Sequence, residues 1–400
     1  MTKDEQRKTE LMLKELEKKR KLQEFAEKHG VNLDEVAMNE WYELNEILGY
    51  QWAMYYILLG ARETGKSYTA MRFCLKQWKE KGVPFVWIRL SAVSTQKLLA
   101  NKAMKLIDPE FYREFDLDLT TKGMDVFDHG KLMCKVLALS ECAKEKGVAM
   151  YDSEYNGWYN CVLDEFQREP GEVKRFSIKD ALATTLENCF RSRKHKVRVI
   201  MICNVLEKCN EVLAECFNFI PEQFGIYKLV KNKKILSRML QELEETTNAD
   251  ERQIIYNKYR GIDFGKRAVI HYIAPTEGYK VRRSGTLADV IAGEQSNFTN
   301  EIKLDYSLLY KGQLRKPDAI IKFTTSPSDW FTIWNGRVIC QYNKENLNNT
   351  IAMRPYIDEV YSPQLRDTTI QRYHARALYF RDMITQRKFE SHLESIKANG

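Results

Sequence analysis

The sequence predicts an α/β protein built on a parallel β-sheet, followed by a small connecting region and an α+β C-terminal part. Three observations lead to this prediction. Residues 60–67 read G-A-R-E-T-G-K-S, a complete phosphate-loop pattern between a strand-like and a helix-like segment. Short apolar strands alternate with helical segments from about residue 40 to 220, which is typical of a parallel sheet with crossovers. From about residue 300 the pattern becomes mainly β, with a hairpin predicted at residues 330–342 around Asn335-Gly336 and a long amphipathic helix predicted after it, from about Pro363 to Ile396.

The phosphate-loop pattern stands between the two elements that its chemistry requires. Residues 55–59 form a short apolar run suited to a buried strand, and residues 68–78 have helical spacing. Backbone N–H groups of such a loop surround phosphate oxygens, and the helix that follows adds its positive dipole end. We therefore expect Lys66 to contact the β- and γ-phosphates of a nucleoside triphosphate and Ser67 to bind Mg²⁺. The residues expected to bind the nucleotide are Gly60, Ala61, Arg62, Glu63, Thr64, Gly65, Lys66, Ser67 and Tyr68.

Three more parallel strands are predicted after the loop helix, at residues 84–89, 161–163 and 197–203. Between the first two, residues 126–132 fit a β-hairpin that turns at 128–130. The carboxyl ends of parallel strands meet at one edge of a sheet, where ligands bind. Polar residues at these strand ends are therefore candidates for the site.

Asp164 and Glu165 follow the strand at 161–163 and are the next candidates. Asp164 is expected to hold Mg²⁺ together with Ser67. Glu165 is suited to orient and polarise the water that attacks the γ-phosphate, which favours hydrolysis over transfer to a small molecule. An ordinary charged turn after a strand is the alternative.

Two candidates depend on less specific patterns. Asn204 ends the strand at 197–203 and could contact the γ-phosphate or the attacking water, although helix caps and turns use the same residue type. The basic segment 191–198 contains Arg191 and Arg193, which could stabilise transition-state charge in a neighbouring subunit. A solvated basic turn or a nucleic-acid contact fits these residues as well, and their spacing does not decide the matter.

Composition narrows the classes of protein to which this chain could belong. The 400 residues are 44% hydrophobic, enough for two or three domains with a substantial core. The longest apolar stretch, residues 52–61, is about half of a membrane span, and the N-terminal residues contain no apolar signal core. We therefore expect a cytoplasmic protein with no membrane partner. Nine cysteines without a C-x-x-C pair and six scattered histidines predict no zinc site, and the net charge of +8 is compatible with a nucleic-acid partner.

Several stretches taken together resemble the DNA-packaging ATPases of phi29-type tailed bacteriophages. The likeness is clearest in L-G-A-R-E-T-G-K-S-Y at 59–68 and V-L-D-E-F-Q-R-E at 162–169. The Lys122-Gly123 pair, G-K-L at 130–132 and F-R-S-R at 190–193 are more particular to that group. A weaker likeness extends into the C-terminal part.

The resemblance implies an ATP-hydrolysing motor that moves double-stranded viral DNA into a preformed procapsid in the cytoplasm of an infected bacterium. It implies a homo-oligomeric ring, usually pentameric, on the portal vertex, with a packaging RNA between ring and portal. The inter-subunit arginine of the group falls on Arg191, with Arg193 as the second candidate. The expected domains are a charged helical extension (1–40), a P-loop ATPase of the additional-strand, catalytic-glutamate (ASCE) class (41–220), a connecting domain (221–300) and an RNase H-like vestigial nuclease that binds nucleic acid (301–400).

Two other functions stay open at this point. A terminase large subunit with an active nuclease would need several carboxylates converging on two metal ions. The predicted C-terminal strands carry none, although five acids elsewhere could assemble: Asp263, Asp305, Asp358, Glu359 and Asp382. An ATP-binding scaffold that does not cycle is the second alternative. Candidates for contact with moving DNA are Lys97, Lys102, Lys105 and the cluster at 228–238, with solvated helix faces as the alternative.

Overall fold

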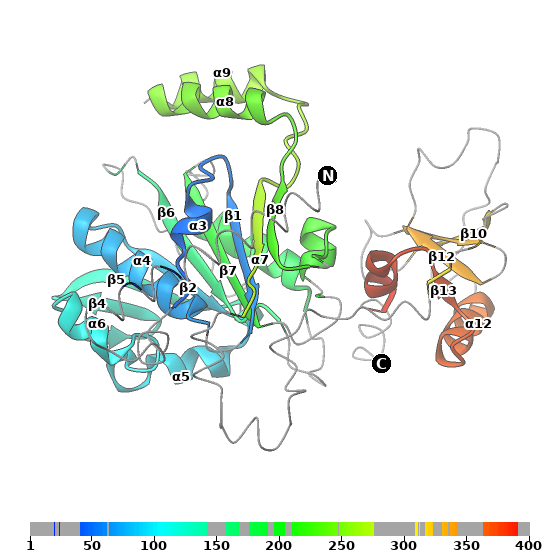
Figure 1. Ribbon diagram of the computed structural model, residues 1–400, viewed down its shortest axis with the longest axis horizontal. Helices are drawn as coiled ribbons and strands as arrows, with labels where there is room; N and C mark the ends of the chain where they lie inside the picture. The colour runs from blue at the N-terminus through cyan, green and yellow to red at the C-terminus, as the bar shows by residue number, and fades with distance from the viewer. Residues whose placement is uncertain are drawn as a thin grey trace. The chain divides into compact units, whose positions relative to one another are not determined.

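The computed structural model of the chain divides into two compact units, which are described separately (Figure 1). The first unit comprises residues 1–166, 181–206 and 223–301, and the second comprises the remainder. The structure describes residues 41–61, 64–141, 157–167, 176–190, 196–204, 212–221, 223–246, 248–275, 317–322, 330–334, 337–341 and 363–390, together with Arg20, Glu24, Tyr155, Asn210, Leu309, Tyr310 and Gly312.

A nine-stranded sheet forms the centre of the first unit, with the order β3-β4-β5-β2-β6-β7-β1-β9-β8. The strands are β1 (Tyr55–Gly60), β2 (Phe85–Arg89), β3 (Leu119–Lys122), β4 (Asp125–Asp128), β5 (Lys131–Ala138), β6 (Tyr159–Asp164), β7 (Val197–Asn204), β8 (Gly225–Leu229) and β9 (Ala268–Tyr272). All neighbours from β5 to β9 are parallel, whereas β3, β4 and β8 are antiparallel to their neighbours. The four predicted parallel strands and the predicted hairpin, β4–β5, are thereby confirmed.

Helices cover this sheet and explain why its central strands are apolar (Figure 1). They are α3 (Asn45–Leu48), α4 (Lys66–Lys81), α5 (Ala92–Ala103), α6 (Pro109–Glu114) and α7 (Ile178–Phe190). Two further helices, α8 (Lys233–Glu245) and α9 (Ala249–Lys258), stand beyond one edge of the sheet (Figure 1). Tyr56, Val162 and Ile200 of the sheet pack in one buried cluster with Ala70 and Cys74 of α4. The loop helix is therefore anchored directly on the strands that lead to the predicted site.

Strands β8 and β9 lie within residues 221–300, the segment predicted as a connecting domain, yet both belong to the central sheet. β9 pairs parallel with β1 from Tyr55↔Ala268 to Leu59↔Tyr272, and all its residues are buried. The sheet therefore continues past the predicted boundary at residue 220. Local patterns show that a segment is apolar, but they do not show which strand it will pair with. What stands between β8 and β9 is a helical hairpin, α8–α9.

The second unit contains a four-stranded sheet with the order β10-β11-β12-β13. Its strands are β10 (Pro317–Lys322), β11 (Trp330–Trp334), β12 (Val338–Gln341) and β13 (Tyr379–Phe380). Helix α12 (Pro363–His374) lies between β12 and β13 in the sequence. The first three strands are antiparallel, which confirms the predicted hairpin β11–β12, and β13 is parallel to β12. Phe331, Phe380 and Phe389 lie in its core.

The long helix predicted from Pro363 to about Ile396 is wrong. α12 ends at His374, β13 intervenes, and a second helix occupies residues 383–390. Leu378 and Phe380 are buried in the core of the sheet, so tertiary packing outweighs helical propensity in this stretch.

The predicted helical extension, residues 1–40, lies outside the described residues except for Arg20 and Glu24. These two exposed side chains form an i,i+4 ion pair at 3.4 Å. Among the described helices, none combines the length and apolar character that crossing a membrane requires.

Candidate nucleotide-binding site

The phosphate loop joins β1 to α4, and its geometry requires glycine at position 65. Gly65 is the N-cap of α4 and has φ 88°, in the left-handed region that favours glycine. A Cβ atom there would lie 2.8 Å from Cε3 of Trp41, closer than real contacts allow. Thr64 is buried, and its hydroxyl donates to the Ala61 carbonyl at 3.1 Å. Arg62 and Glu63 lie outside the described residues.

Lys66 is buried inside this loop. Its ammonium group donates to the Gly60 carbonyl at 3.1 Å and to the Thr64 hydroxyl at 3.0 Å, and it also contacts the Ala61 carbonyl. The loop therefore holds the cationic head of Lys66 where an incoming phosphate oxygen could replace a carbonyl partner.

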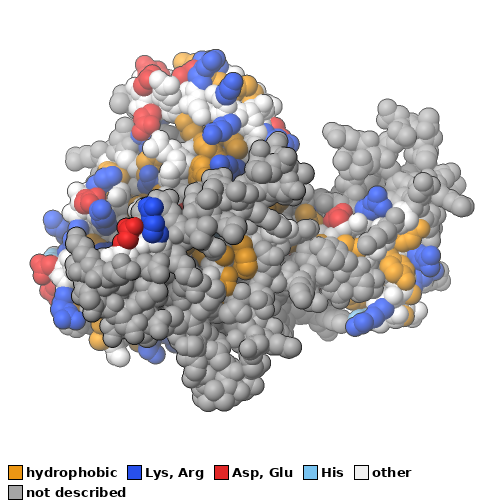
Figure 2. All heavy atoms as spheres, in the orientation of Figure 1, with side chains coloured by type: hydrophobic (Ala, Val, Ile, Leu, Met, Phe, Trp, Pro, Cys, Tyr) orange, Lys and Arg blue, Asp and Glu red, His pale blue; other side chains and the backbone are white. Residues whose placement is uncertain are grey.

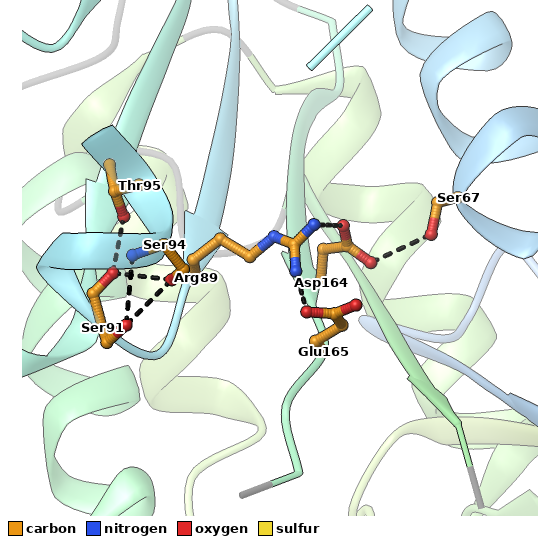
Figure 3. A network of polar contacts seen from close by, with 7 residues as sticks. All are labelled: Ser67, Arg89, Ser91, Ser94, Thr95, Asp164 and Glu165. Atoms are coloured by element: carbon orange, nitrogen blue, oxygen red, sulfur yellow. Dashed lines mark hydrogen bonds and ion pairs between the residues drawn. The ribbon is translucent and has the colours of Figure 1, made fainter. Parts of the chain in front are cut away.

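Ser67 and Asp164 meet at the carboxyl edge of the sheet (Figure 3). The Ser67 hydroxyl donates to Oδ1 of Asp164 at 3.0 Å. Burial raises the pKa of the Asp164 carboxyl above its ordinary value, and the nearby Arg89 guanidinium opposes that shift.

One hydroxyl and one carboxylate suit Mg²⁺, which usually takes its other ligands from phosphates and water. The described residues contain no group of three or more His, Cys, Asp or Glu side chains placed to hold a metal ion. The pair formed by Ser67 and Asp164 could supply two ligands to a magnesium ion that arrives with a nucleotide.

Arg89 completes this edge, and sequence reasoning did not identify it as a functional residue. It is the last residue of β2, which pairs with β6 in register at Ile88↔Leu163. Its guanidinium lies between two carboxylates (Figure 3): one nitrogen is 2.9 Å from Oδ2 of Asp164, and another contacts Oε2 of Glu165. An arginine at a strand end is unremarkable in sequence, so only the pairing of β2 with β6 reveals this contact.

Glu165 has a backbone conformation that is unusual for its residue type. Its φ is 57°, which is uncommon for a non-glycine residue and is often associated with functional sites. The chain turns sharply after β6, so Asp164 is buried while the Glu165 side chain is 55% exposed. The two adjacent acids share Arg89 but otherwise have different environments, since Asp164 is buried beside Ser67 and Glu165 faces solvent.

A tight turn links Arg89 to helix α5. The Ser91 hydroxyl accepts from the Ser94 backbone N–H at 3.2 Å, and the Ser94 and Thr95 hydroxyls donate to the Ser91 carbonyl at 2.8 and 3.0 Å (Figure 3). These bonds fix the first turn of α5 two residues after Arg89. Lys97 lies exposed on this helix.

Residues just upstream of β1 fold over the phosphate loop. The Tyr42 backbone N–H donates to the Thr64 carbonyl at 3.0 Å. The Trp41 ring stacks on the Tyr68 ring, with centroids 5.7 Å apart and an interplanar angle of 23°. Tyr68 was predicted as a site residue, whereas the role of Trp41 was missed because no sequence pattern joins it to the loop.

The remaining predicted site residues are placed as follows. Asn204 ends β7 and pairs in register with Gly60, so it lies beside the start of the loop. Arg191 and Arg193 lie outside the described residues. The described residues flanking them, Phe190 at the end of α7 and Lys196 before β7, stand at the opposite edge of the sheet from Asp164, because β6 and β7 are parallel.

Of the five acids considered for a nuclease, the two in the described residues have local structural roles. Asp263 forms an ion pair with Lys231 at 2.8 Å and accepts from the Gly265 N–H at 2.8 Å. Asp382 accepts from the backbone and hydroxyl of Thr385 at 2.8 and 3.0 Å, as a helix cap does. The other three acids lie outside the described residues.

The chain matches two curated relatives over part of its length. The DNA packaging proteins of Bacillus phage PZA and Bacillus phage phi29 are each 27% identical to it over 197 residues, which covers 47% of this chain and 54% of each relative. The chain thus spans about half the length of the curated relatives it matches.

A solved structure, the Phi-28 gp11 DNA packaging motor, is similar in fold. Its TM-score is 0.58 at 14% sequence identity, covering 90% of this chain and 98% of that one. At the level of sequence families, residues 37–346 match the family described as podovirus DNA encapsidation protein (Gp16). Because this match covers well over half of the sequence, the chain belongs to the podovirus DNA encapsidation protein (Gp16) family.

Proposed function

We propose that this protein is an ATP-hydrolysing motor that moves double-stranded viral DNA into a preformed procapsid. Family membership and the packaging role of the relatives from phages PZA and phi29 support the packaging part. The observation that carries the ATPase part is the convergence of Ser67, Asp164 and Glu165 on one sheet edge, beside the buried Lys66.

Each residue has a distinct task in this proposal. Lys66 and the N-terminal turn of α4 bind the β- and γ-phosphates, and Ser67 and Asp164 hold Mg²⁺, which neutralises phosphate charge when bound. Glu165 orients a water molecule and accepts its proton. The Glu165 carboxylate is engaged by Arg89, so it must leave this ion pair before it can act as a base. Arg89 therefore makes hydrolysis depend on the position of β2 and of α5 behind it.

The sheet topology supports assignment to the ASCE class. β7 lies between the loop strand β1 and the Asp164 strand β6, as the additional strand of that class would, and Glu165 follows directly. For the second unit we propose an RNase H-like nucleic-acid-binding domain without nuclease activity. The local capping role of Asp382 supports the loss of activity.

The positions of Phe190 and Lys196, the described residues on either side of Arg191 and Arg193 in the sequence, support a ring. Both stand at the sheet edge opposite Asp164, away from the nucleotide site of their own subunit. We propose that Arg191, with Arg193 as the second candidate, acts on the nucleotide of a neighbour in a pentameric ring. The ring would work on the portal, with packaging RNA, in the cytoplasm of the infected bacterium.

Phosphate release by the full chain tests this proposal, measured with and without double-stranded DNA, procapsids and packaging RNA. Strong stimulation that requires all three is the expected result. ATP binding without DNA-stimulated release would favour a scaffold instead. Plasmid nicking with Mn²⁺ that is lost in Asp263→Asn or Asp358→Asn would favour a terminase with an active nuclease.

A further inference from the structure

Helix α8 carries its charges in the order opposite to the one its dipole favours. Acidic side chains stabilise the N-terminal turn of a helix and basic ones stabilise the last turn. α8 instead begins with Lys233 and Lys234 and ends with Glu244 and Glu245. Its N-cap, Asn232, provides no side-chain cap hydrogen bond. Helix stability therefore does not explain these charges.

The hairpin α8–α9 is consequently basic at one end and acidic at the other. Its helices run antiparallel, since Lys258 contacts Glu242 at 2.7 Å and Arg252 Nε donates to the Thr246 carbonyl at 3.0 Å. The basic end, next to the sheet, consists of exposed Lys231, Lys233, Lys234, Arg238, Arg260 and Lys266, with Asp263 as its acid. The acidic end consists of Glu242, Glu244, Glu245, Asp250 and Glu251, with Arg252 as a base on the same end. Within the chain, Glu242 pairs with Lys258 at 2.7 Å and Glu244 lies 3.9 Å from Lys196, whereas Glu245, Asp250 and Glu251 form no ion pair among the described residues. Figure 2 shows acidic side chains toward the left of the hairpin, at the top of the view, and basic ones toward its right.

Each helix of the hairpin also exposes an isoleucine. Ile235, next to Lys234, is 39% exposed, and Ile254, between Arg252 and Lys258, is 66% exposed. Few large hydrophobic side chains are exposed in the described part of the chain, and two of them lie on this hairpin. An apolar contact surrounded by charge is typical of a protein–protein interface.

We propose that the basic end of the hairpin in one subunit docks on the acidic end of the hairpin in the next. Duplex nucleic acid would suit the basic end alone, because its phosphates repel the acidic end and make no use of Ile254. A second copy of the chain accounts for both ends and both isoleucines. Such a head-to-tail contact is heterologous, and it closes into a ring when the rotation allows.

This contact goes beyond the proposed ATPase and does not rest on it. The hairpin connects Leu229, at the end of β8, to Ala268, at the start of β9 and beside the start of β1. It therefore stands at the sheet edge opposite Ser67 and Asp164, and its charges can be changed without touching the nucleotide site.

Charge reversal in the full chain tests the contact. Three variants are compared with wild type by analytical ultracentrifugation: Lys233→Glu with Lys234→Glu, Glu244→Lys with Glu245→Lys, and the combination of all four changes. Each double variant alone should weaken self-association at least tenfold, because like charges then face each other across the contact between subunits. The combination should restore association because its ends are complementary again, and association should weaken with added salt.

The melting temperatures of the same variants show whether they fold. Both reversals give α8 the charge order that its dipole favours, while Glu244→Lys also removes a long ion pair with Lys196 at 3.9 Å, so their melting temperatures should stay close to that of wild type. Lys122→Glu with Lys131→Glu, two exposed lysines on β3 and β5, is the matched control and should leave association unchanged.

Three results would overturn the contact: association unaffected by either reversal, no restoration in the fourfold variant, or basic-end reversal that only removes binding of a duplex DNA probe. A wild-type chain that assembles but does not hydrolyse ATP would contradict the proposed function and leave this contact standing.

Discussion

The Ser67 hydroxyl and the Asp164 carboxylate lie 3.0 Å apart although 97 positions separate them in the chain. The contact exists because α4 and β6 both reach the same edge of the sheet. Arg89 approaches the other oxygen of Asp164 at 2.9 Å, so the buried carboxylate is held from both sides. This arrangement makes Asp164 the residue on which metal binding should depend most.

Asp164→Asn should weaken Mg²⁺-dependent ATP binding by about tenfold or more, since a neutral amide is a poor magnesium ligand. Binding should also depend on pH. Burial raises the pKa of Asp164, and a carboxyl must lose its proton to bind a metal. Affinity should therefore fall as the pH drops through that raised pKa, at a higher pH than an ordinary aspartate near about 3.9 would require. Binding of a fluorescent ATP analogue across the pH range measures both effects, with the exposed carboxylate variant Asp180→Asn as the control.

Arg89→Ala should move that pH dependence further upward. Removing the guanidinium takes away the largest influence that opposes the burial effect, so the pKa of Asp164 rises further. Arg89→Lys should give an intermediate result, because an ammonium group cannot bridge two carboxylates as a planar guanidinium does. An unchanged pH profile in Arg89→Ala would show that this ion pair does not control Asp164.

Gly65→Ala should destabilise the fold for two separable reasons. The left-handed backbone costs about 1–2 kcal/mol for a residue with a Cβ, and the Cβ also collides with Trp41. In a Trp41→Ala background only the backbone cost remains, so the same change should destabilise less. Denaturant unfolding of the four proteins in this double-mutant cycle measures the difference. Equal losses in both backgrounds would mean that Trp41 does not cover the loop.

Asp128→Asn should destabilise the β4–β5 hairpin by about 2 kcal/mol or more at neutral pH. Burial acts to raise the pKa of this carboxyl, but donors on Lys79, Trp78, Asp118 and His129 together lower it below its ordinary value. The stabilisation is therefore complete above the unfolded pKa of about 3.9 and is lost as the pH falls through the lower folded value. Unfolding free energies of wild type and variant should converge in acid; a constant difference would contradict this.

Local patterns predicted much of this architecture. The phosphate loop, Asp164-Glu165 and the central parallel strands are short segments whose residue types fix their structure or chemistry. The β4–β5 hairpin was found for the same reason: His129-Gly130 supplies two left-handed positions in a turn between apolar runs.

What the sequence did not reveal depends on contacts between distant segments. Arg89 became a site residue only through the pairing of β2 with β6, and Trp41 only by folding back on Gly65. The pairing of β9 with β1 is likewise a long-range choice. In the second unit, burial of Phe380 interrupts a segment that has helical spacing.

Steady-state phosphate release by Glu165→Gln in the presence of double-stranded DNA tests ATP hydrolysis at this site most directly. The variant keeps Lys66, Ser67 and Asp164, so ATP binding should stay within a few-fold of wild type. Removing a positioned general base should lower turnover by about 10²-fold or more. Glu80→Gln, an exposed change on α4, serves as the control and should hydrolyse normally. Normal turnover in Glu165→Gln would contradict the assignment of Glu165 as the hydrolytic base.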